Sequence, residues 1–181
     1  MKSQLLRSYN IVEKQNLLLN AVLGSLALAI SSQIALPWGP VPFTLQTSVL
    51  FFLAFKFGFA STLCMVSAYL LEGACGLPVF AEFTGGLHTL FGPTGGYLWG
   101  FIPALFCFDK FVAQEKRSFG TVSIAIVLSS IPIFLLGFLQ LSGFIGFAEA
   151  YRWGVSPFLF SETGKIAVVS YICALSSKYN G

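Results

Sequence analysis

The sequence contains very little charge. Only 9% of its 181 residues are Asp, Glu, Lys or Arg, whereas soluble domains average about 25%. Hydrophobic residues make up 56% of the chain, and the mean hydropathy is +0.81. This balance excludes an ordinary soluble domain and predicts an integral membrane protein, with the lipid bilayer as its surroundings. The net charge of +3 gives no reason to expect nucleic-acid binding, because the placement of the basic residues has another explanation, given below.

Residues that carry out catalysis or bind metals are also scarce. The cysteines stand apart, with no C-x-x-C pair, at Cys64, Cys75, Cys107 and Cys173. The single histidine, His88, has no ligand or nucleophile partner at a suitable spacing. Gly164-Lys165 does not belong to a phosphate-binding loop, because that motif needs Gly at position 159 and Ser or Thr at position 166. We therefore expect no enzyme, metal or cofactor, and any ATP-driven step would belong to a partner chain.

Long runs without charge predict the membrane topology. At roughly 20 residues per crossing, the run from Leu17 to Phe55 must be two spans broken near Pro37-Trp38-Gly39-Pro40. The sequence then predicts a single all-α domain, 1–181, without a hydrophilic linker and with a first span that is retained rather than cleaved. The expected spans are 17–36, 44–55, 58–73, 94–109, 119–141 and 161–177.

The basic residues predict the orientation of these six spans. With the N-terminus inside, only Arg152 and Lys165 fall on the outer side. The inner side then holds Lys2, Arg7, Lys14, Lys56, Lys110, Lys116, Arg117 and Lys178. Because basic residues favour the cytoplasmic side of a membrane, both termini are predicted to be cytoplasmic.

The predicted outer connections share an unusual composition. Residues 72–100 contain eight glycines and two prolines, and irregular backbone is tolerated at membrane depth only where it lines a protein-enclosed cavity. A Gly, Pro and Phe pattern recurs at 39–43, 76–80 and 154–158, each in a different outer connection. This recurrence predicts long outer loops that cap an apolar, aromatic ligand pocket. Alternatively, Gly and Pro end the helices, and Phe anchors them at the interface.

Glu162 and Lys165 are the strongest candidates for polar recognition. Their spacing of three places both on one face of a helix, and charges within an apolar span usually have a function. Lys165 would donate to a ligand carbonyl or carboxylate, and Glu162 would accept ligand N–H groups. The alternative is an ion pair at the membrane surface, in which Glu162 stabilises the start of the helix.

Two further features are candidates for contacts. Glu82 lies beside aromatic residues in the Gly-rich loop and is either a ligand-binding or a solvated carboxylate. Ala21, Ser25 and Ala29 form a stripe of small residues on the first span, which allows another helix to approach closely. That helix belongs either to this bundle or to a partner protein.

Three segments resemble the biotin transporter family BioY, whose members are the substrate-binding S components of energy-coupling factor transporters. The segments are 41–47 (Val-Pro-Phe-Thr-Leu-Gln-Thr), 76–81 (Gly-Leu-Pro-Val-Phe-Ala) and 91–97 (Phe-Gly-Pro-Thr-Gly-Gly-Tyr). The resemblance extends from about Leu17 to Lys165. It implies a six-helix bundle in the bacterial cytoplasmic membrane, in which loops around 37–46 and 74–96 close over biotin.

The resemblance also implies partners. S components work with a transmembrane coupling subunit and two ATPase subunits, and Ser25 with Ala29 occupies the place where many members contact the coupling subunit. The expected function is biotin capture from outside and release inward. The remaining alternatives are an S component for another small vitamin, and a membrane enzyme or packing subunit that transports nothing.

For the binding site, the resemblance places polar groups against the ureido head of biotin and aromatic groups around its rings and chain. The expected polar residues are Glu162, Lys165, Glu82 and Gln46, and the expected aromatic residues are Trp38, Phe43, Phe83 and Tyr97. One departure concerns the start of the sixth helix, where this chain has Phe160-Ser161-Glu162 and the family usually has Pro-Gly-Asp. The orientation of biotin relative to Lys165 stays open at this level.

Overall fold

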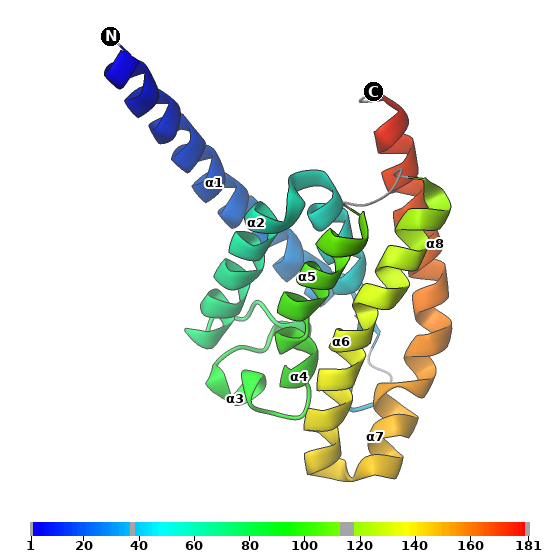
Figure 1. The fold of residues 1–181 in the computed structure, drawn as a ribbon. Helices are drawn as coiled ribbons and strands as arrows, with labels where there is room; N and C mark the ends of the chain where they lie inside the picture. Colours follow the sequence, from blue (N-terminus) through cyan, green and yellow to red (C-terminus); the bar gives the residue numbers. More distant parts are fainter. Residues whose placement is uncertain (1, 37–38, 113–117, 180–181) are drawn as a thin grey trace.

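The computed structural model describes residues 2–36, 39–112 and 118–179, and within them the side chains of 17–36, 39–112, 118–158 and 161–176. Figure 1 shows a bundle of helices joined by compact loops. The elements, in chain order, are α1 (Lys2–Gln33), β1 (Ala35–Leu36), β2 (Phe43–Thr44), α2 (Gln46–Ala74), η1 (Ala81–Phe83), α3 (Leu87–Leu90), α4 (Gly95–Trp99), α5 (Phe101–Val112), α6 (Phe119–Ile145), α7 (Phe147–Gly154) and α8 (Ser156–Tyr179). The predicted helical character is thus confirmed.

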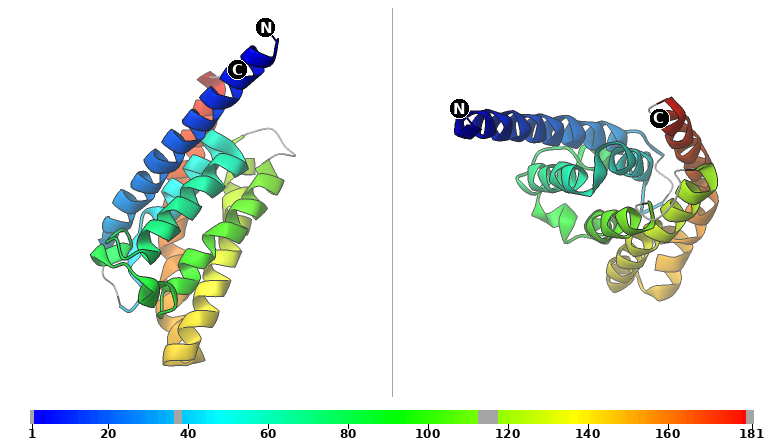
Figure 2. Two further views of the ribbon diagram at one scale, coloured as in Figure 1. Left: turned by 90° about the vertical axis from the view of Figure 1, so that its left-hand side faces the viewer. Right: turned by 45° about the horizontal axis from the view of Figure 1, so that its top comes forward.

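Both ends of the chain lie at the same end of the bundle, and the first part of α1 extends beyond the other helices (Figures 1 and 2). The opposite end carries the β1–β2 pair, η1, α3 and α7. The interior is apolar, and its fully buried side chains come from several helices, for example Leu28, Phe51, Tyr69, Leu105 and Val122. The loops that the sequence singled out therefore gather at the end of the bundle away from the termini.

Helix α2 is two antiparallel arms. Gly58 interrupts the helix with φ 76° and ψ 176°, a conformation that glycine adopts readily. The Gln46 Nε2 atom lies 2.6 Å from the Tyr69 hydroxyl oxygen, although 23 residues of straight helix would separate them by about 35 Å. The sequence prediction of two segments divided near 56–58 agrees with this reversal.

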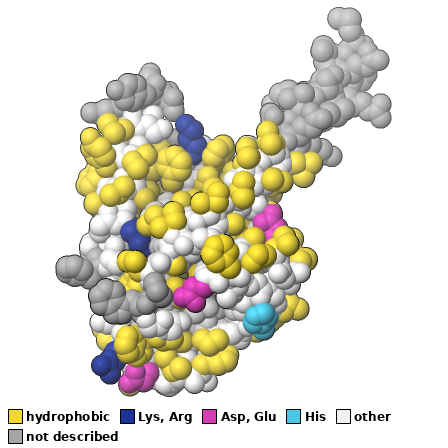
Figure 3. Space-filling view, turned by 180° about the vertical axis from the view of Figure 1, so that it is seen from behind, with side chains coloured by type: hydrophobic (Ala, Val, Ile, Leu, Met, Phe, Trp, Pro, Cys, Tyr) yellow, Lys and Arg dark blue, Asp and Glu magenta, His cyan; other side chains and the backbone are white. Residues whose placement is uncertain are grey.

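The surface suits a membrane environment. Figure 3 shows hydrophobic side chains over much of one face, with few charged groups among them. In the described part of the chain, three stretches have the length and apolar composition of a membrane crossing, namely Gln46–Ala74, Phe119–Ile145 and Phe147–Ser176. The first of them folds back at Gly58, and the third joins α7 to most of α8. Helix α1 contributes a shorter apolar stretch, Leu17–Gln33. The six predicted crossings and their orientation remain a prediction.

Some boundaries differ from the sequence prediction. Helix α1 begins at Lys2 instead of residue 17, α6 continues to Ile145 instead of 141, and α8 begins at Ser156 instead of 161. At α1 the reason is that hydropathy marks only the apolar part of a helix, whereas backbone hydrogen bonding continues through the polar residues before it. The all-α prediction also missed the short antiparallel pair β1–β2, in which Ala35 lies opposite Thr44.

The Gly-Gly pair before Tyr97 places α4 directly against α6. A Cβ atom at Gly96 would collide with the backbone carbonyl of Leu136, and one at Gly95 would meet the backbone carbonyl of Leu90. Only glycine permits this backbone contact, because any other residue adds a Cβ atom. The contact positions Tyr97 and Leu98, which follow directly and line the cavity described next.

Candidate functional site

A cavity of about 350 Å³ lies among the loops at the end of the bundle away from the termini. Known small-molecule sites measure about 300 to 1,000 Å³, are mostly apolar and contain a few placed polar groups. Its walls come from five segments: 40–47, 80–94, 97–101, 133–134 and 158–165. The two connections expected to cap a ligand, around 37–46 and 74–96, thus contribute to one cavity.

Glu162 and Lys165 form a buried ion pair in the cavity wall. The Lys165 Nζ atom lies 2.7 Å from Glu162 Oε1, and the side chains are only 15% and 8% exposed, respectively. Both residues are in the second and third turns of α8, where their spacing of three brings them together. The ion pair that the alternative interpretation proposed is thus present, but its side chains are largely buried instead of exposed at the surface.

Residues of the β2–α2 segment complete the surroundings of the pair. Lys165 Nζ donates to the Thr44 carbonyl oxygen at 2.7 Å, and the Thr47 hydroxyl donates to Glu162 Oε2 at 3.2 Å. A lysine ammonium has three donors, and the contacts with Glu162 and Thr44 use two of them. Among the described residues, these contacts leave one donor of Lys165 and some lone pairs of Glu162 for a ligand.

An aromatic cluster forms the apolar part of the wall. The Phe158 ring stacks on Phe43 with centroids 4.3 Å apart, and lies 6.2 Å from Tyr97 and 5.5 Å from Phe134. Phe158 is the central member of the cluster. Phe43 contacts Phe158 but is not among the described residues that line the cavity.

The Tyr97 hydroxyl is fixed by its own hydrogen bond. It donates to the Gly154 carbonyl oxygen at 2.9 Å, at the end of α7. The Tyr97 ring lines the cavity, and its hydroxyl oxygen can still accept a hydrogen bond. Tyr97 therefore joins α4 to α7 and presents an oriented aromatic surface to a ligand.

Like Phe43, two other predicted ligand residues are not among the described residues that line the cavity. Phe83 is 72% exposed and is not among the described residues that line the cavity, although its neighbour Glu82 is. Gln46 is buried away from the cavity, where it donates to the Tyr69 hydroxyl and accepts from Thr44 Oγ1 at 3.1 Å. Trp38 lies outside the described residues. Ligand contacts by Phe43, Gln46, Phe83 and Trp38 remain predictions.

Several lining residues were not selected from the sequence. Thr44, Thr47, Phe134, Phe158 and His88 all line the cavity. Phe158 carried a signal, since it ends the third Gly, Pro and Phe pattern, but Phe134 lies within an apolar helix like many other phenylalanines. Among the described residues, no group of three or more His, Cys, Asp or Glu side chains is arranged to hold a metal ion.

The small-residue stripe on α1 packs inward at its centre. Ser25 is 1% exposed, and its hydroxyl donates to Glu72 Oε1 of α2 at 2.8 Å. Ala29 packs against the main core, and a Cβ atom at Gly24 would collide with the Met65 side chain. The neighbour that approaches Ser25 is therefore α2 of the same chain. A partner contact at Ala21, Ser25 and Ala29 remains a prediction without support from this arrangement.

Comparisons with known protein families and with individual proteins all find the BioY family. The model of the BioY family matches residues 3–180. A relative from Thermotoga maritima, named biotin transporter BioY, is 36% identical over 156 residues, which are 86% of this chain and 92% of that protein. A relative from Pyrococcus horikoshii, named probable biotin transporter BioY, is 36% identical over 149 residues, which are 80% of this chain and 85% of that protein.

A solved structure shares the fold. The S component for biotin from an ECF-type ABC transporter superposes with a TM-score of 0.79, covers 92% of this chain and 93% of its own, and is 22% identical. At this level of identity the likeness concerns the arrangement of the helices.

Proposed function

Because the chain belongs to the BioY family, we propose that it is a biotin transport component that captures biotin from outside the cell and releases it inward. It is a multi-pass membrane protein and a transport component, not an enzyme. The single observation that carries the proposal beyond family membership is the buried Glu162–Lys165 pair, 2.7 Å apart, in the wall of an apolar cavity of ligand size.

The chemistry of the cavity suits biotin. The ureido ring of biotin offers two N–H donors and a carbonyl, and its valeryl chain ends in a carboxylate. Glu162 can accept N–H groups, and the remaining donor of Lys165 can bind either the carbonyl or the carboxylate. The aromatic rings of Phe158, Tyr97 and Phe134 provide an apolar surface for the thiophane ring and the chain.

The partner subunits follow from the same proposal. We infer that the chain associates with other subunits of an ECF transporter, specifically a transmembrane coupling subunit and two ATPases, in the cytoplasmic membrane of a bacterium. The location of both termini at one end of the bundle (Figure 1) supports an even number of crossings, and the distribution of basic residues supports cytoplasmic termini. The cavity then opens toward the outside.

Equilibrium binding to the purified chain alone tests the proposal. We expect saturable binding of one biotin per chain, and binding of thiamine and riboflavin at least ~100-fold weaker, because ligands that leave buried polar groups unpaired are rejected strongly. Equilibrium dialysis in detergent measures this directly. Preferential binding of another vitamin would indicate a different S component, and the absence of any saturable binding would contradict the transport proposal.

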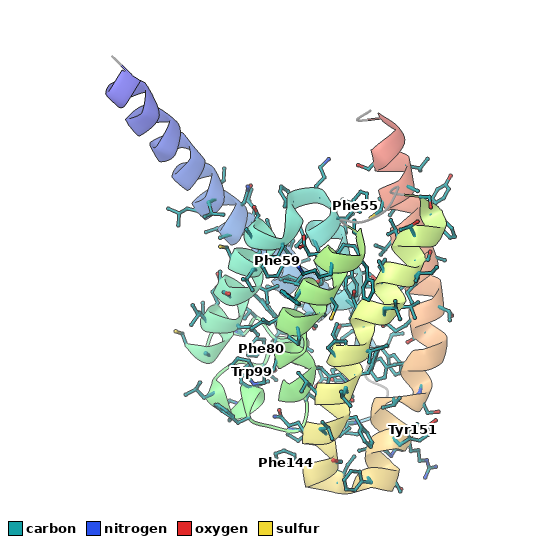
Figure 4. All side chains as sticks on the ribbon, viewed as in Figure 1. Phe55, Phe59, Phe80, Trp99, Phe144 and Tyr151 are labelled. Atoms are coloured by element: carbon teal, nitrogen blue, oxygen red, sulfur yellow. The ribbon has the colours of Figure 1, made fainter. Side chains whose placement is uncertain are left out.

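The aromatic wall makes a second test possible. Phe158→Leu keeps an apolar side chain but removes the ring face in the cavity, so we expect about 3- to 10-fold weaker biotin binding. Phe144→Leu is the matched control, since Phe144 is 55% exposed near the end of α6 (Figure 4). Equal losses for both variants, measured by equilibrium dialysis, would show that Phe158 has no special part in the site.

A further inference from the structure

The cavity wall contains a turn in an unfavourable backbone conformation. The Thr84 N–H donates to the Ala81 carbonyl oxygen at 3.2 Å, and the two residues between them, Glu82 and Phe83, have φ values of 58° and 56°. Positive φ at both central positions is typical of a type I′ turn, in which Gly and Asn are preferred. Side chains with a Cβ atom avoid this region. The turn therefore needs support from its surroundings.

One side-chain amide supplies that support. Gln33, the last residue of α1, donates from Nε2 to the Phe80 carbonyl oxygen at 2.9 Å and accepts at Oε1 from the Phe83 N–H at 3.0 Å. Both functional groups of the amide are thus bound to backbone groups on either side of Glu82. The neighbouring Ser32 hydroxyl adds a hydrogen bond to the Val79 carbonyl oxygen at 2.8 Å.

The start of the turn is fixed by packing. The Phe80 ring is 1% exposed and meets Tyr69 edge to face, with centroids 5.4 Å apart. A Cβ atom at Gly73 of α2 would collide with the Phe80 ring, so the ring, labelled in Figure 4, packs closely on α2. Gln33 thus holds the backbone of the turn, and the Phe80 ring anchors its start in the core. Glu82, the acidic residue of this turn, lines the cavity.

We propose that Gln33 is a positioning residue for ligand binding, which acts by holding the 80–84 turn so that the Glu82 carboxylate faces the ligand. This inference rests on the proposed biotin function only for the identity of the ligand. It joins α1 to the cavity wall, although Gln33 itself is not among the described residues that line the cavity.

A double-mutant cycle tests the route through Glu82. Gln33→Ala is expected to weaken biotin binding about tenfold in the wild-type background and to cause no further loss in a Glu82→Ala background. Gln33→Glu serves as the second variant, because it keeps the acceptor for the Phe83 N–H and loses the donor to Phe80. We expect its binding to lie between those of wild type and Gln33→Ala.

Gln140 provides the matched control. Its Nε2 atom donates to the Leu90 and Gly92 carbonyl oxygens, at 3.2 Å and 2.5 Å, and so supports a different part of the cavity wall. The binding losses of Gln140→Ala and Glu82→Ala should add, because Gln140 does not act through Glu82. A loss from Gln33→Ala that adds to that from Glu82→Ala in the same way would overturn the proposal.

Hydrogen exchange without ligand separates this proposal from the biotin function. Gln33→Ala should speed amide exchange in residues 80–84, and Gln140→Ala should leave exchange there unchanged. If wild-type protein binds no biotin, the biotin function fails, while the exchange result still tests the support of the turn. If wild-type protein binds biotin and Gln33→Ala binds it equally well, the positioning role of Gln33 is overturned while the biotin function stands.

Discussion

Replacing Lys165 with alanine is expected to weaken biotin binding by about 10- to 100-fold, since a hydrogen bond to a charged group contributes about 1.5 to 3 kcal/mol and each 1.4 kcal/mol is a factor of ten. The substitution removes the remaining ligand donor and leaves the buried Glu162 carboxylate without its cation. Equilibrium dialysis with labelled biotin measures the loss. Unchanged affinity would remove Lys165 from the binding site.

A companion variant separates binding from folding. Breaking a buried ion pair from one side is destabilising by about 3 to 5 kcal/mol, because it leaves one charge uncompensated. The double variant Glu162→Gln with Lys165→Met removes both charges and should unfold at nearly the wild-type temperature while binding biotin poorly. If this double variant bound biotin normally, neither charge would be needed for recognition.

The exposed Glu149–Arg152 ion pair is the matched control for the loss of the Glu162–Lys165 ion pair. It has the same spacing of three, but its nitrogen–oxygen distance is 3.9 Å and its side chains are 50% and 71% exposed. Exposed pairs contribute about 0 to 1 kcal/mol. Arg152→Ala is therefore expected to leave both biotin binding and thermal stability close to wild type.

Gly96→Ala is expected to destabilise the protein by at least about 1 to 3 kcal/mol, the usual effect of overpacking. Its Cβ atom would collide with the Leu136 backbone carbonyl, which has no alternative rotamer and can move only with α6. Because Tyr97 and Leu98 line the cavity, biotin binding should decrease as well. Thermal unfolding in detergent measures the first effect, and equilibrium dialysis measures the second.

Gly143 of α6 is the control for this substitution. A Cβ atom at Gly143 meets no atom within 4 Å, and alanine is favoured over glycine within a helix by about 0.5 to 1 kcal/mol. Gly143→Ala should therefore leave the unfolding temperature unchanged or raise it slightly. Similar destabilisation by Gly96→Ala and Gly143→Ala would contradict the close packing of α4 on α6.

Two charged residues of the site could be predicted from the sequence. Charged residues are rare in this chain, so Glu162 and Lys165 are conspicuous, and helical periodicity places them on one face. Phe134 has no such signal, because an apolar helix contains many phenylalanines and only packing decides which of them faces a cavity. Gln46 shows the same limit for a polar residue, since the reversal at Gly58 brings Tyr69 to its side chain.

The stripe of small residues on α1 shows what spacing does and does not predict. Ala21, Ser25 and Ala29 predict a close neighbour, because small side chains permit close approach. The identity of that neighbour depends on the path of the whole chain. In the fold, Ser25 meets Glu72 of α2 and is buried there.

The sequence by itself determined the membrane character, the helical class and the placement of Glu162 and Lys165 on one face of a helix, because these depend on composition and on spacings of a few residues. The tertiary structure alone decided that Thr44 and Thr47 complete the surroundings of the pair and that Gln33 supports the turn of Glu82. The physical reason is sequence separation. Thr44 lies 121 residues from Lys165, so only the folding of distant helices against one another brings their polar groups within hydrogen-bonding distance.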